Sequence, residues 1–469
     1  MGKYKNLGVN TILVFIGNAS SKIIGLVMLP FYTRHLTVDE YGISDIVVVY
    51  VSLLLGLCSC CIHDAIFVFP KGKSLKEQKR YFSSGLSFVA FSGIISAIIL
   101  YSLFHLFNYL KILDSFVDNV FYIYSLLICQ IILNYVQQFS RSINKILHYS
   151  LTGIVLTGFT ALLAFLLIPR LHLDGFFLSL IIAYIFAIIY CLISVRAFWM
   201  ISLSEIHFPY LKELLTYSIP LIPNGIMWWL VSSVNRPILE RFTNYHEIGL
   251  LAVANKFPGI LSMLFTVFIT SWQISVMEEF GKEDYNKFYN NVFKFVFVCS
   301  SLLLTIITML SKTLVSIFAT EDYMIAWMYI PILTMSVLFQ NVGGVVGCNF
   351  SATKESKYYF YSSVWSGVSA ILFNILFIPQ YGIFGASLAT LLAMFVMAVS
   401  RCYYSWKYVV INNIPGLLLL ALINIGEYIL LLKTENVVLI LTIVLLHISL
   451  SIYMLHDELY KMLVKIRKR

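Results

Sequence analysis

Charged residues are scarce in this 469-residue sequence: Lys, Arg, Asp and Glu make up 12% of it, whereas hydrophobic residues make up 60%. The mean hydropathy is accordingly +0.87. A soluble fold cannot bury so large an apolar fraction, whereas a lipid bilayer does not require it to be buried. The composition therefore argues against a soluble catalytic domain and predicts an all-α protein that crosses a membrane many times.

Motifs for catalysis are also missing, because the sequence shows no nucleophile triad, no metal-ligand constellation and no phosphate-cradling glycine loop. The eight cysteines lie within or beside apolar segments, where thiols pack as small hydrophobic side chains. Cys58, Cys60 and Cys61 have only His63 as a nearby imidazole, which favours helix packing over a metal site. We expect neither an enzyme nor a bound metal or other cofactor.

Apolar runs of about 20 residues, enough to cross roughly 30 Å of hydrocarbon, follow one another along the chain. The runs and the breaks between them predict fourteen spans, at 9–32, 42–63, 81–104, 119–138, 150–168, 175–196, 214–235, 248–273, 290–311, 325–349, 358–378, 383–402, 414–432 and 436–455. The first run lacks a small-residue cleavage site, so we expect it to be a helix of the mature protein rather than a signal peptide.

Basic residues alternate between the two sides of the predicted membrane. With these spans, 23 Lys and Arg residues lie on the side of the N-terminus and 7 on the other side. The positive-inside rule then places both termini in the cytoplasm. The net charge of +9 is mainly a topology signal, so we expect no nucleic-acid partner. The basic C-terminal tail is expected to meet anionic lipid headgroups.

Two sequence patterns recur at nearly the same offset. Pro30, Arg34, Glu40 and Gly42 return 207 residues later as Pro237, Arg241, Glu247 and Gly249. Ile168, Pro169, Gly175 and Leu178 return 210 residues later as Ile378, Pro379, Gly385 and Leu388. Two such echoes predict an internal duplication. The offset corresponds to six spans, and an even number keeps the orientation, so the halves are expected to be parallel six-helix repeats.

The repeat predicts the domain organisation. An N-terminal six-helix bundle occupies 1–197, a cytoplasmic linker 198–213 and a C-terminal six-helix bundle 214–404. Residues 405–469 add helices 13 and 14 and the basic tail.

Polar residues inside apolar spans are candidates for function, because a buried charge is costly unless it faces water or a partner. Those predicted to line a hydrated cavity between the halves are Lys22, Lys256, Asn18, Asn224, Asn235, Asn255 and Gln273. Arg34, Arg236 and Arg241 are predicted to line its outer mouth. A basic cavity suits an anionic group such as a diphosphate. The alternative is that the lysines snorkel or pair with acids such as Asp45, and that the arginines anchor the interface.

Carboxylates within the spans are candidates for ion coupling. Asp45 and Asp64 are the best placed, and Glu240 and Glu427 are further candidates. No cluster of acids is evident, so the sequence assigns no coupling site. Glu40 and Glu247, beside Arg34 and Arg241, are expected to stabilise turns or form salt bridges.

The sequence resembles the Wzx-type O-antigen and polysaccharide flippases of the multidrug/oligosaccharidyl-lipid/polysaccharide exporter superfamily. The residues that carry the resemblance are Asn10-Thr11, Pro30 to Arg34, Tyr41-Gly42, Ile219 to Pro223, Trp228-Trp229, Arg236, Gly249, Ala254 to Pro258, Ser271 to Gln273 and Ser351 to Lys354. One departure is Asn235, since an acid often precedes the equivalent arginine in such proteins.

The resemblance implies two MATE-like bundles that move a polyprenyl-diphosphate-linked oligosaccharide between leaflets of the bacterial inner membrane by alternating access. Lys22 and Lys256 would hold the diphosphate or acidic sugars, and the polysaccharide polymerase machinery would use the product. Three alternatives stay open: a flippase for the peptidoglycan precursor lipid II, a multidrug extruder of the same superfamily, and a membrane scaffold for polysaccharide enzymes. A pocket for organic cations should be acidic, whereas this one is predicted to be basic.

Overall fold

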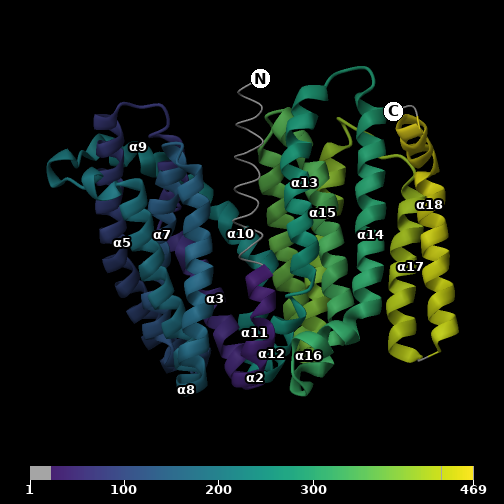
Figure 1. Ribbon diagram of the computed structural model, residues 1–469, viewed down its shortest axis with the longest axis horizontal. Helices are drawn as coiled ribbons and strands as arrows, with labels where there is room; N and C mark the ends of the chain where they lie inside the picture. The colour runs from purple at the N-terminus through teal and green to yellow at the C-terminus, as the bar shows by residue number, and fades with distance from the viewer. Residues whose placement is uncertain (1–22, 435, 468–469) are drawn as a thin grey trace. The chain divides into compact units, whose positions relative to one another are not determined.

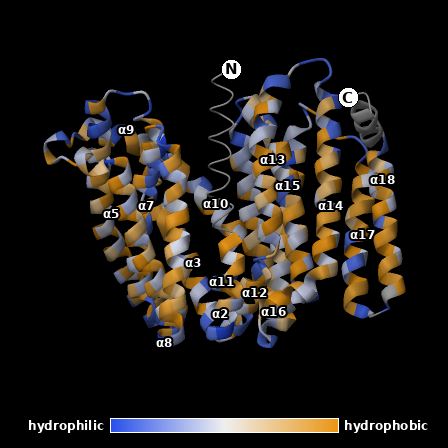
Figure 2. Ribbon diagram, in the orientation of Figure 1, coloured by the Kyte–Doolittle hydropathy of each residue, from blue (hydrophilic) through white to orange (hydrophobic). Residues whose placement is uncertain are grey.

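The computed structural model describes residues 23–434 and 436–467, and all the regular elements in these ranges are helices (Figure 1). The chain divides into two compact units, Met1–Ala252 and Val253–Arg469. Eleven described helical segments are long and apolar enough to cross a membrane. Figure 2 shows hydrophobic residues along the length of the long helices and hydrophilic residues mainly near their ends. The prediction of an all-α polytopic membrane protein is confirmed.

The first unit contains the helices from α2 to α12, whose last two residues cross the boundary between the units. They are α2 (Leu29–His35), α3 (Val38–Cys58), α4 (Ile62–Val68), α5 (Leu75–Leu110), α6 (Asp114–Asp118), α7 (Val120–Ser142), α8 (Ile146–Val195), α9 (Phe208–Ser218), α10 (Ile222–Ser233), α11 (Asn235–Phe242) and α12 (Tyr245–Ala254). Short 3₁₀ turns at Ala197–Met200 and Leu203–Glu205 connect α8 to α9, and another at Ile219–Leu221 precedes α10.

The second unit holds the remaining helices. They are α13 (Pro258–Glu279), α14 (Tyr285–Phe318), α15 (Ile330–Ala352), α16 (Lys357–Ser405), α17 (Ile414–Lys433) and α18 (Val437–Arg467), with a 3₁₀ segment at Glu321–Met328. α15 contacts α13, α14 and α16, and most of its side chains are buried. α17 and α18 pack against each other and against α14.

α8 and α16 are each two helices joined at a sharp break. α8 has 50 residues and leaves helical geometry at His172, with φ 47° and ψ −121°. α16 has 49 residues and leaves it at Gly382, with φ 53° and ψ −131°. These two residues are 210 positions apart, which is the offset of the second sequence echo. The echo therefore corresponds to a repeated backbone conformation, and the predicted breaks within 168–175 and 378–383 are confirmed.

The predicted single span 248–273 is wrong, because α12 ends at Ala254 and α13 begins at Pro258. Proline has no amide hydrogen and its ring clashes with the carbonyl four residues earlier, so it fits a helix start and kinks or breaks a helix when it lies inside one. The predicted span 214–235 corresponds to the candidate membrane segment Phe208–Ser233, in which a 3₁₀ turn at Ile219–Leu221 precedes α10. Hydropathy alone therefore joined helices that proline and turn geometry separate.

Candidate functional site

Arg236 and Asp45 form an ion pair in the first unit, in which Arg236 is buried and the Asp45 side chain is 23% exposed. Arg236 Nε donates to Asp45 Oδ2 over 3.2 Å, which links α11 to α3. Arg236 Nη1 also donates to the Ser232 carbonyl oxygen over 3.1 Å and to Asn235 Oδ1 over 2.9 Å. One predicted ion-coupling residue is thus the carboxylate that neutralises one of the predicted substrate-binding arginines.

Glu240 lies one turn beyond Arg236 on α11 and accepts three hydrogen bonds from other segments. The donors are the Tyr50 hydroxyl on α3, the Ser115 amide on α6 over 2.8 Å, and the Tyr245 hydroxyl on α12 over 3.3 Å. Together with the Asp45–Arg236 pair, these bonds fix α11 against α3 along two of its turns. Sequence reasoning identified Glu240 as a candidate carboxylate but missed its partners, because they lie 5 to 190 residues away.

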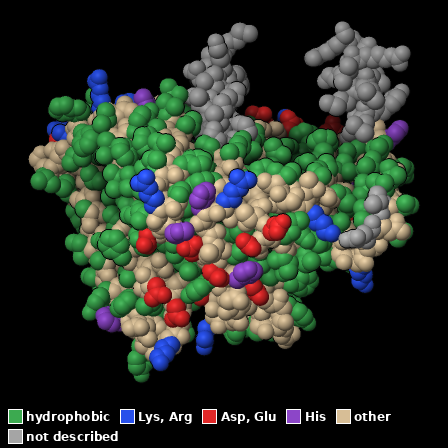
Figure 3. Space-filling model, turned by 60° about the horizontal axis from the view of Figure 1, so that its bottom comes forward, with side chains coloured by type: hydrophobic (Ala, Val, Ile, Leu, Met, Phe, Trp, Pro, Cys, Tyr) green, Lys and Arg blue, Asp and Glu red, His purple; other side chains and the backbone are tan. Residues whose placement is uncertain are grey.

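Arg34 and Arg241 occupy equivalent positions, each in the last turn of its helix, and both are exposed. A cation is favoured there by the partial negative charge of a helix C-terminus. Exposed acids share this end of the first unit, at Asp39, Asp114, Asp118 and Asp174. Figure 3, in which the bottom of the molecule comes forward, shows acidic, basic and histidine side chains dispersed among hydrophobic ones.

Asn224 lies on an exposed polar face of α10. Trp228 and Ser232 follow at intervals of four residues, and all three are exposed. The neighbouring Trp229 turns the other way, and its indole donates to the Val49 carbonyl oxygen of α3 over 3.1 Å. Asn235, also predicted to line a cavity, is buried beside Arg236 instead.

α13 carries a second exposed polar face, in the other unit. Thr266, Thr270 and Gln273 are exposed, and Gln273 Nε2 donates to Ser351 Oγ over 3.1 Å. Asn255 and Lys256 are half-buried in the break between α12 and α13, so they do not continue this helical face. The predicted stripe from Asn255 to Gln273 is therefore interrupted at the break before Pro258.

Three other predicted residues are less informative. Lys22 and Asn18 lie outside the described residues, so it stays a prediction that Lys22 and Lys256 line the same cavity. The Asp64 side chain is 48% exposed and lies 3.8 Å from His63 Nε2. Within the described residues, no three His, Cys, Asp or Glu side chains are grouped so that they could hold a metal ion.

A buried polar cluster joins α14, α17 and α18 in the second unit. Glu427 Oε1 lies 2.9 Å from His447 Nδ1, and Thr305 Oγ1 donates to Glu427 Oε2 over 2.8 Å. Ser301 Oγ lies 3.0 Å from His447 Nε2, and Asn424 Nδ2 donates to Ser301 Oγ over 2.6 Å. Sequence reasoning named Glu427 and missed His447, although an ionisable residue within an apolar span was the available signal.

Comparison with solved structures identifies the fold. The lipid II flippase MurJ in an inward closed conformation matches with a TM-score of 0.66 and 18% identity, over 97% of this chain and 100% of that one. An inward-facing multidrug resistance MATE family transporter of the MOP superfamily matches with a TM-score of 0.66 and 12% identity, over 84% of this chain and 94% of that one.

A MOP superfamily transporter from Pyrococcus furiosus, described as having a binding pocket of reverse polarity, matches with a TM-score of 0.54 and 13% identity, over 86% of this chain and 95% of that one. No curated protein gives a significant sequence match. The sequence model for polysaccharide biosynthesis proteins matches residues 7–274, more than half of the chain. The chain thus has the fold of the MurJ and MATE transporters, and it belongs to the polysaccharide biosynthesis protein family.

Proposed function

We propose that this protein is a flippase that moves a polyprenyl-diphosphate-linked oligosaccharide from the cytoplasmic to the outer leaflet of a bacterial inner membrane. The observation that carries the proposal is the exposure of polar side chains on two helical segments that are long and apolar enough to span a membrane. The amides of Asn224 on α10 and Gln273 on α13 would be costly against lipid, and Ser232 and Thr270 add hydroxyl groups to the same exposed faces. They suit a hydrated pathway that admits sugars.

The proposed topology has fourteen spans with both termini in the cytoplasm. Counting α8 and α16 as two crossings each raises the eleven described candidates to thirteen, and the apolar run at 9–32 adds the first. The proposed domains are two parallel six-helix repeats at 1–197 and 214–404, a linker between them, and an appended helix pair with the tail. The matching breaks at His172 and Gly382 support the duplication.

In this proposal, basic residues bind the diphosphate or acidic sugars. Lys22 and Lys256 hold the anion within the pathway, and Arg34, Arg236 and Arg241 act nearer the outer side. Arg236 is paired with Asp45 in the structure, so an incoming diphosphate competes with that carboxylate for the guanidinium. Exchange of one anion for the other would let Arg236 bind the substrate and later release it.

A lipid II flippase is the second candidate, since its substrate also carries a polyprenyl diphosphate. The match to MurJ over 97% of this chain favours keeping it. The two candidates differ in the saccharide and in the consequence of losing the gene, because blocked lipid II transport stops wall synthesis.

The decisive test is to delete or deplete the gene and identify the polyprenyl-diphosphate lipids that accumulate, by mass and by leaflet. We expect a complete oligosaccharide unit on the cytoplasmic side, and wild-type transport should be restored by a plasmid copy. Lys256→Glu and Arg236→Glu copies should insert into the membrane but fail to restore transport. Lys282→Glu is the matched control, because Lys282 is exposed and lies outside the described helices.

Accumulated lipid II would select the second candidate. An unchanged lipid pool, or full transport by both charge-reversal copies, would refute the flippase and its basic pathway.

A further inference from the structure

Two adjoining hollows form a groove at the C-terminal end of α16. The first, of about 560 Å³, is lined by Tyr358, Tyr403, Tyr404, Trp406 and Lys407. The second, of about 440 Å³, is lined by Trp365, Phe395, Val396, Val399, Ser400, Tyr403 and Tyr404. Because Tyr403 and Tyr404 line both, the hollows are continuous. We call these ten residues the aromatic groove.

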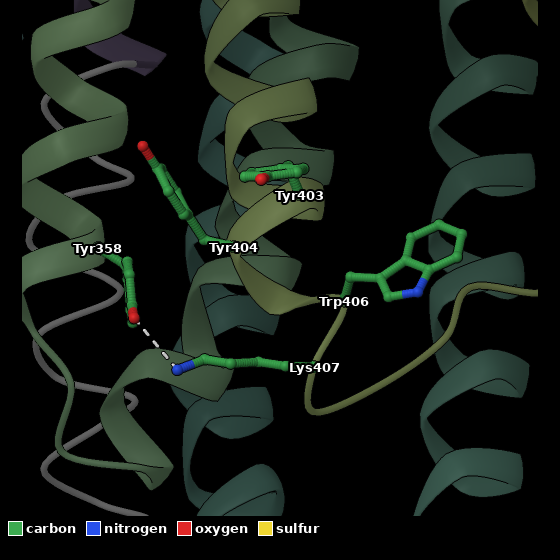
Figure 4. Close-up of a pocket in the computed structure, with 5 residues that line it drawn as sticks. All are labelled: Tyr358, Tyr403, Tyr404, Trp406 and Lys407. Atoms are coloured by element: carbon green, nitrogen blue, oxygen red, sulfur yellow. Dashed lines mark hydrogen bonds between the residues drawn. The ribbon is translucent and has the colours of Figure 1, made fainter.

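The first hollow is polar and basic at its base. Lys407 Nζ donates to Glu355 Oε2 over 2.7 Å and to the Tyr358 hydroxyl over 3.1 Å, and it lies 4.6 Å from the centre of the Tyr358 ring. Figure 4 shows Tyr358 and Lys407 pointing toward each other, with Tyr404 on the side of Tyr358 and Trp406 on the opposite side of the pocket. Two of the three ammonium donors of Lys407 thus have described hydrogen-bond acceptors, and the ammonium also lies 4.6 Å from the centre of the Tyr408 ring.

Positive charge exceeds negative charge around this base. Lys357 Nζ lies 4.0 Å from Glu355, the same carboxylate that Lys407 contacts. One acid therefore faces two lysines, and the Lys357 side chain is 56% exposed. An anionic group placed at the base would complete the charge balance.

The second hollow is apolar and lies within the candidate membrane span Lys357–Ser405. Trp365, Phe395 and Val399 are 57%, 40% and 49% exposed. The Trp365 indole donates to the Tyr404 hydroxyl over 3.1 Å, so its exposed face presents hydrocarbon rather than an unsatisfied donor. At 1.5 Å per residue, the nine steps from Phe395 to Tyr404 extend about 13.5 Å along the helix. The groove therefore runs from the basic helix end into the apolar zone.

We propose that the aromatic groove binds an anionic phospholipid, with its phosphate at Lys407 and Lys357 and one acyl chain along Trp365, Phe395 and Val399. The ligand must be both anionic and amphiphilic, because the basic base and the apolar channel are one continuous surface. Aromatic and basic side chains at a helix end suit the membrane interface, where phospholipid headgroups lie. None of the ten groove residues is among the proposed pathway residues, and the lipid-binding proposal does not depend on the flippase proposal.

The test is a titration of the purified full-length protein with phosphatidylglycerol or phosphatidylcholine of identical acyl chains, followed by native mass spectrometry. We expect tighter binding of phosphatidylglycerol by at least about fivefold, the effect of roughly 1 kcal/mol for one lysine near a headgroup. The double variant Lys357→Gln/Lys407→Gln should lose the preference. Trp365→Ala/Phe395→Ala should weaken the binding of both lipids and keep the preference for phosphatidylglycerol.

Lys282→Gln provides the control for charge, since it removes an exposed lysine with a nearby acid and should keep the preference. If the double variant does not fold, Lys357→Gln alone tests the site. The Lys357 side chain is exposed, and its Nζ lies 4.0 Å from Glu355, so its loss should disturb the fold little. Equal binding of the two lipids by the wild type would overturn the proposal. So would displacement of phosphatidylglycerol by a polyprenyl phosphate together with an unchanged preference in the lysine variants.

Discussion

Gly42 and Gly249 make reciprocal contacts in the first unit. A Cβ atom added to Gly42 would collide with the carbonyl oxygen of Tyr245, and one added to Gly249 would collide with that of Val38. Both the glycines and the carbonyl residues are 207 positions apart. The first echo in the sequence thus marks a contact in which two copies of one motif face each other with local two-fold symmetry.

The starts of α3 and α12, which carry Gly42 and Gly249, are capped in equivalent ways. Thr37 Oγ1 accepts from the Glu40 amide over 3.2 Å, and Asn244 Oδ1 accepts from the Glu247 amide over 3.0 Å. The Glu40 carboxylate also accepts from the Thr37 amide, which completes a capping box. The expectation that Glu40 stabilises a turn is therefore confirmed.

Alanine at either glycine should destabilise the protein. Gly42→Ala and Gly249→Ala force a methyl group against a backbone carbonyl that cannot move without its helix, and such overpacking costs about 1–3 kcal/mol. We expect both variants to have a lower midpoint of thermal unfolding than the wild type. The midpoint is measured on detergent-solubilised protein by size-exclusion chromatography after heating. Gly56→Ala on α3 is the control, because nothing lies within 4 Å of its added Cβ. Equal unfolding midpoints for Gly42→Ala and Gly56→Ala would contradict the close contact between Gly42 and the Tyr245 carbonyl.

The backbone breaks in α8 and α16 predict a second contrast. Gly382 has a positive φ that side chains rarely adopt, so Gly382→Ala should cost about 1–3 kcal/mol. His172 holds nearly the same conformation with a side chain, so His172→Gly should relieve strain and leave stability equal or higher. Unfolding midpoints of the purified variants check both. Gly158→Ala, within a helical part of α8 with open space around it, should be neutral or slightly stabilising. A neutral Gly382→Ala would show that the turn tolerates a side chain.

Local signals explain what the sequence predicted well. Proline and glycine at the α8 and α16 breaks, and apolar runs of membrane length, are properties of short segments, so one sequence reveals them. The error at 248–273 arose because averaged hydropathy gave no weight to Pro258, although its backbone chemistry required a helix start there.

Pairing between distant segments explains what the sequence did not predict. Asp45 and Arg236 are 191 residues apart, and Ser301 and His447 are 146 apart. Each residue is recognisable alone as a polar group in an apolar setting, but no local pattern says which helix will bring its partner. The sequence therefore shows which polar residues lie in an apolar setting, but not which of them meet.

The Asp45–Arg236 pair should contribute to stability. Asp45→Asn leaves the buried guanidinium without its carboxylate, and hydrogen bonds to charged groups contribute about 1.5–3 kcal/mol. We expect a lower unfolding midpoint for Asp45→Asn and for Arg236→Gln, and a smaller loss for the double variant than the sum of the two. Glu279→Gln, which breaks the exposed pair with Lys282, should change stability by at most about 1 kcal/mol. Strict additivity of Asp45→Asn and Arg236→Gln would show that the pair is not coupled.

The cluster around Glu427 and His447 predicts how the appended helices are held. Glu427 contacts both α14 and α18, so its loss removes the carboxylate that His447 and Thr305 share, while Ser301 and Asn424 still contact them. Interhelical hydrogen bonds in membranes contribute about 1–2 kcal/mol in model peptides, so Glu427→Leu and His447→Leu should each lower the unfolding midpoint. The double variant should recover part of the loss, because two apolar side chains leave fewer unpaired polar groups in the interior. Leu422→Ala on the exposed side of α17 should have little effect. If the double variant instead loses as much stability as both single variants together, Glu427 and His447 contribute independently. Their mutual contact then does not couple α17 to α18.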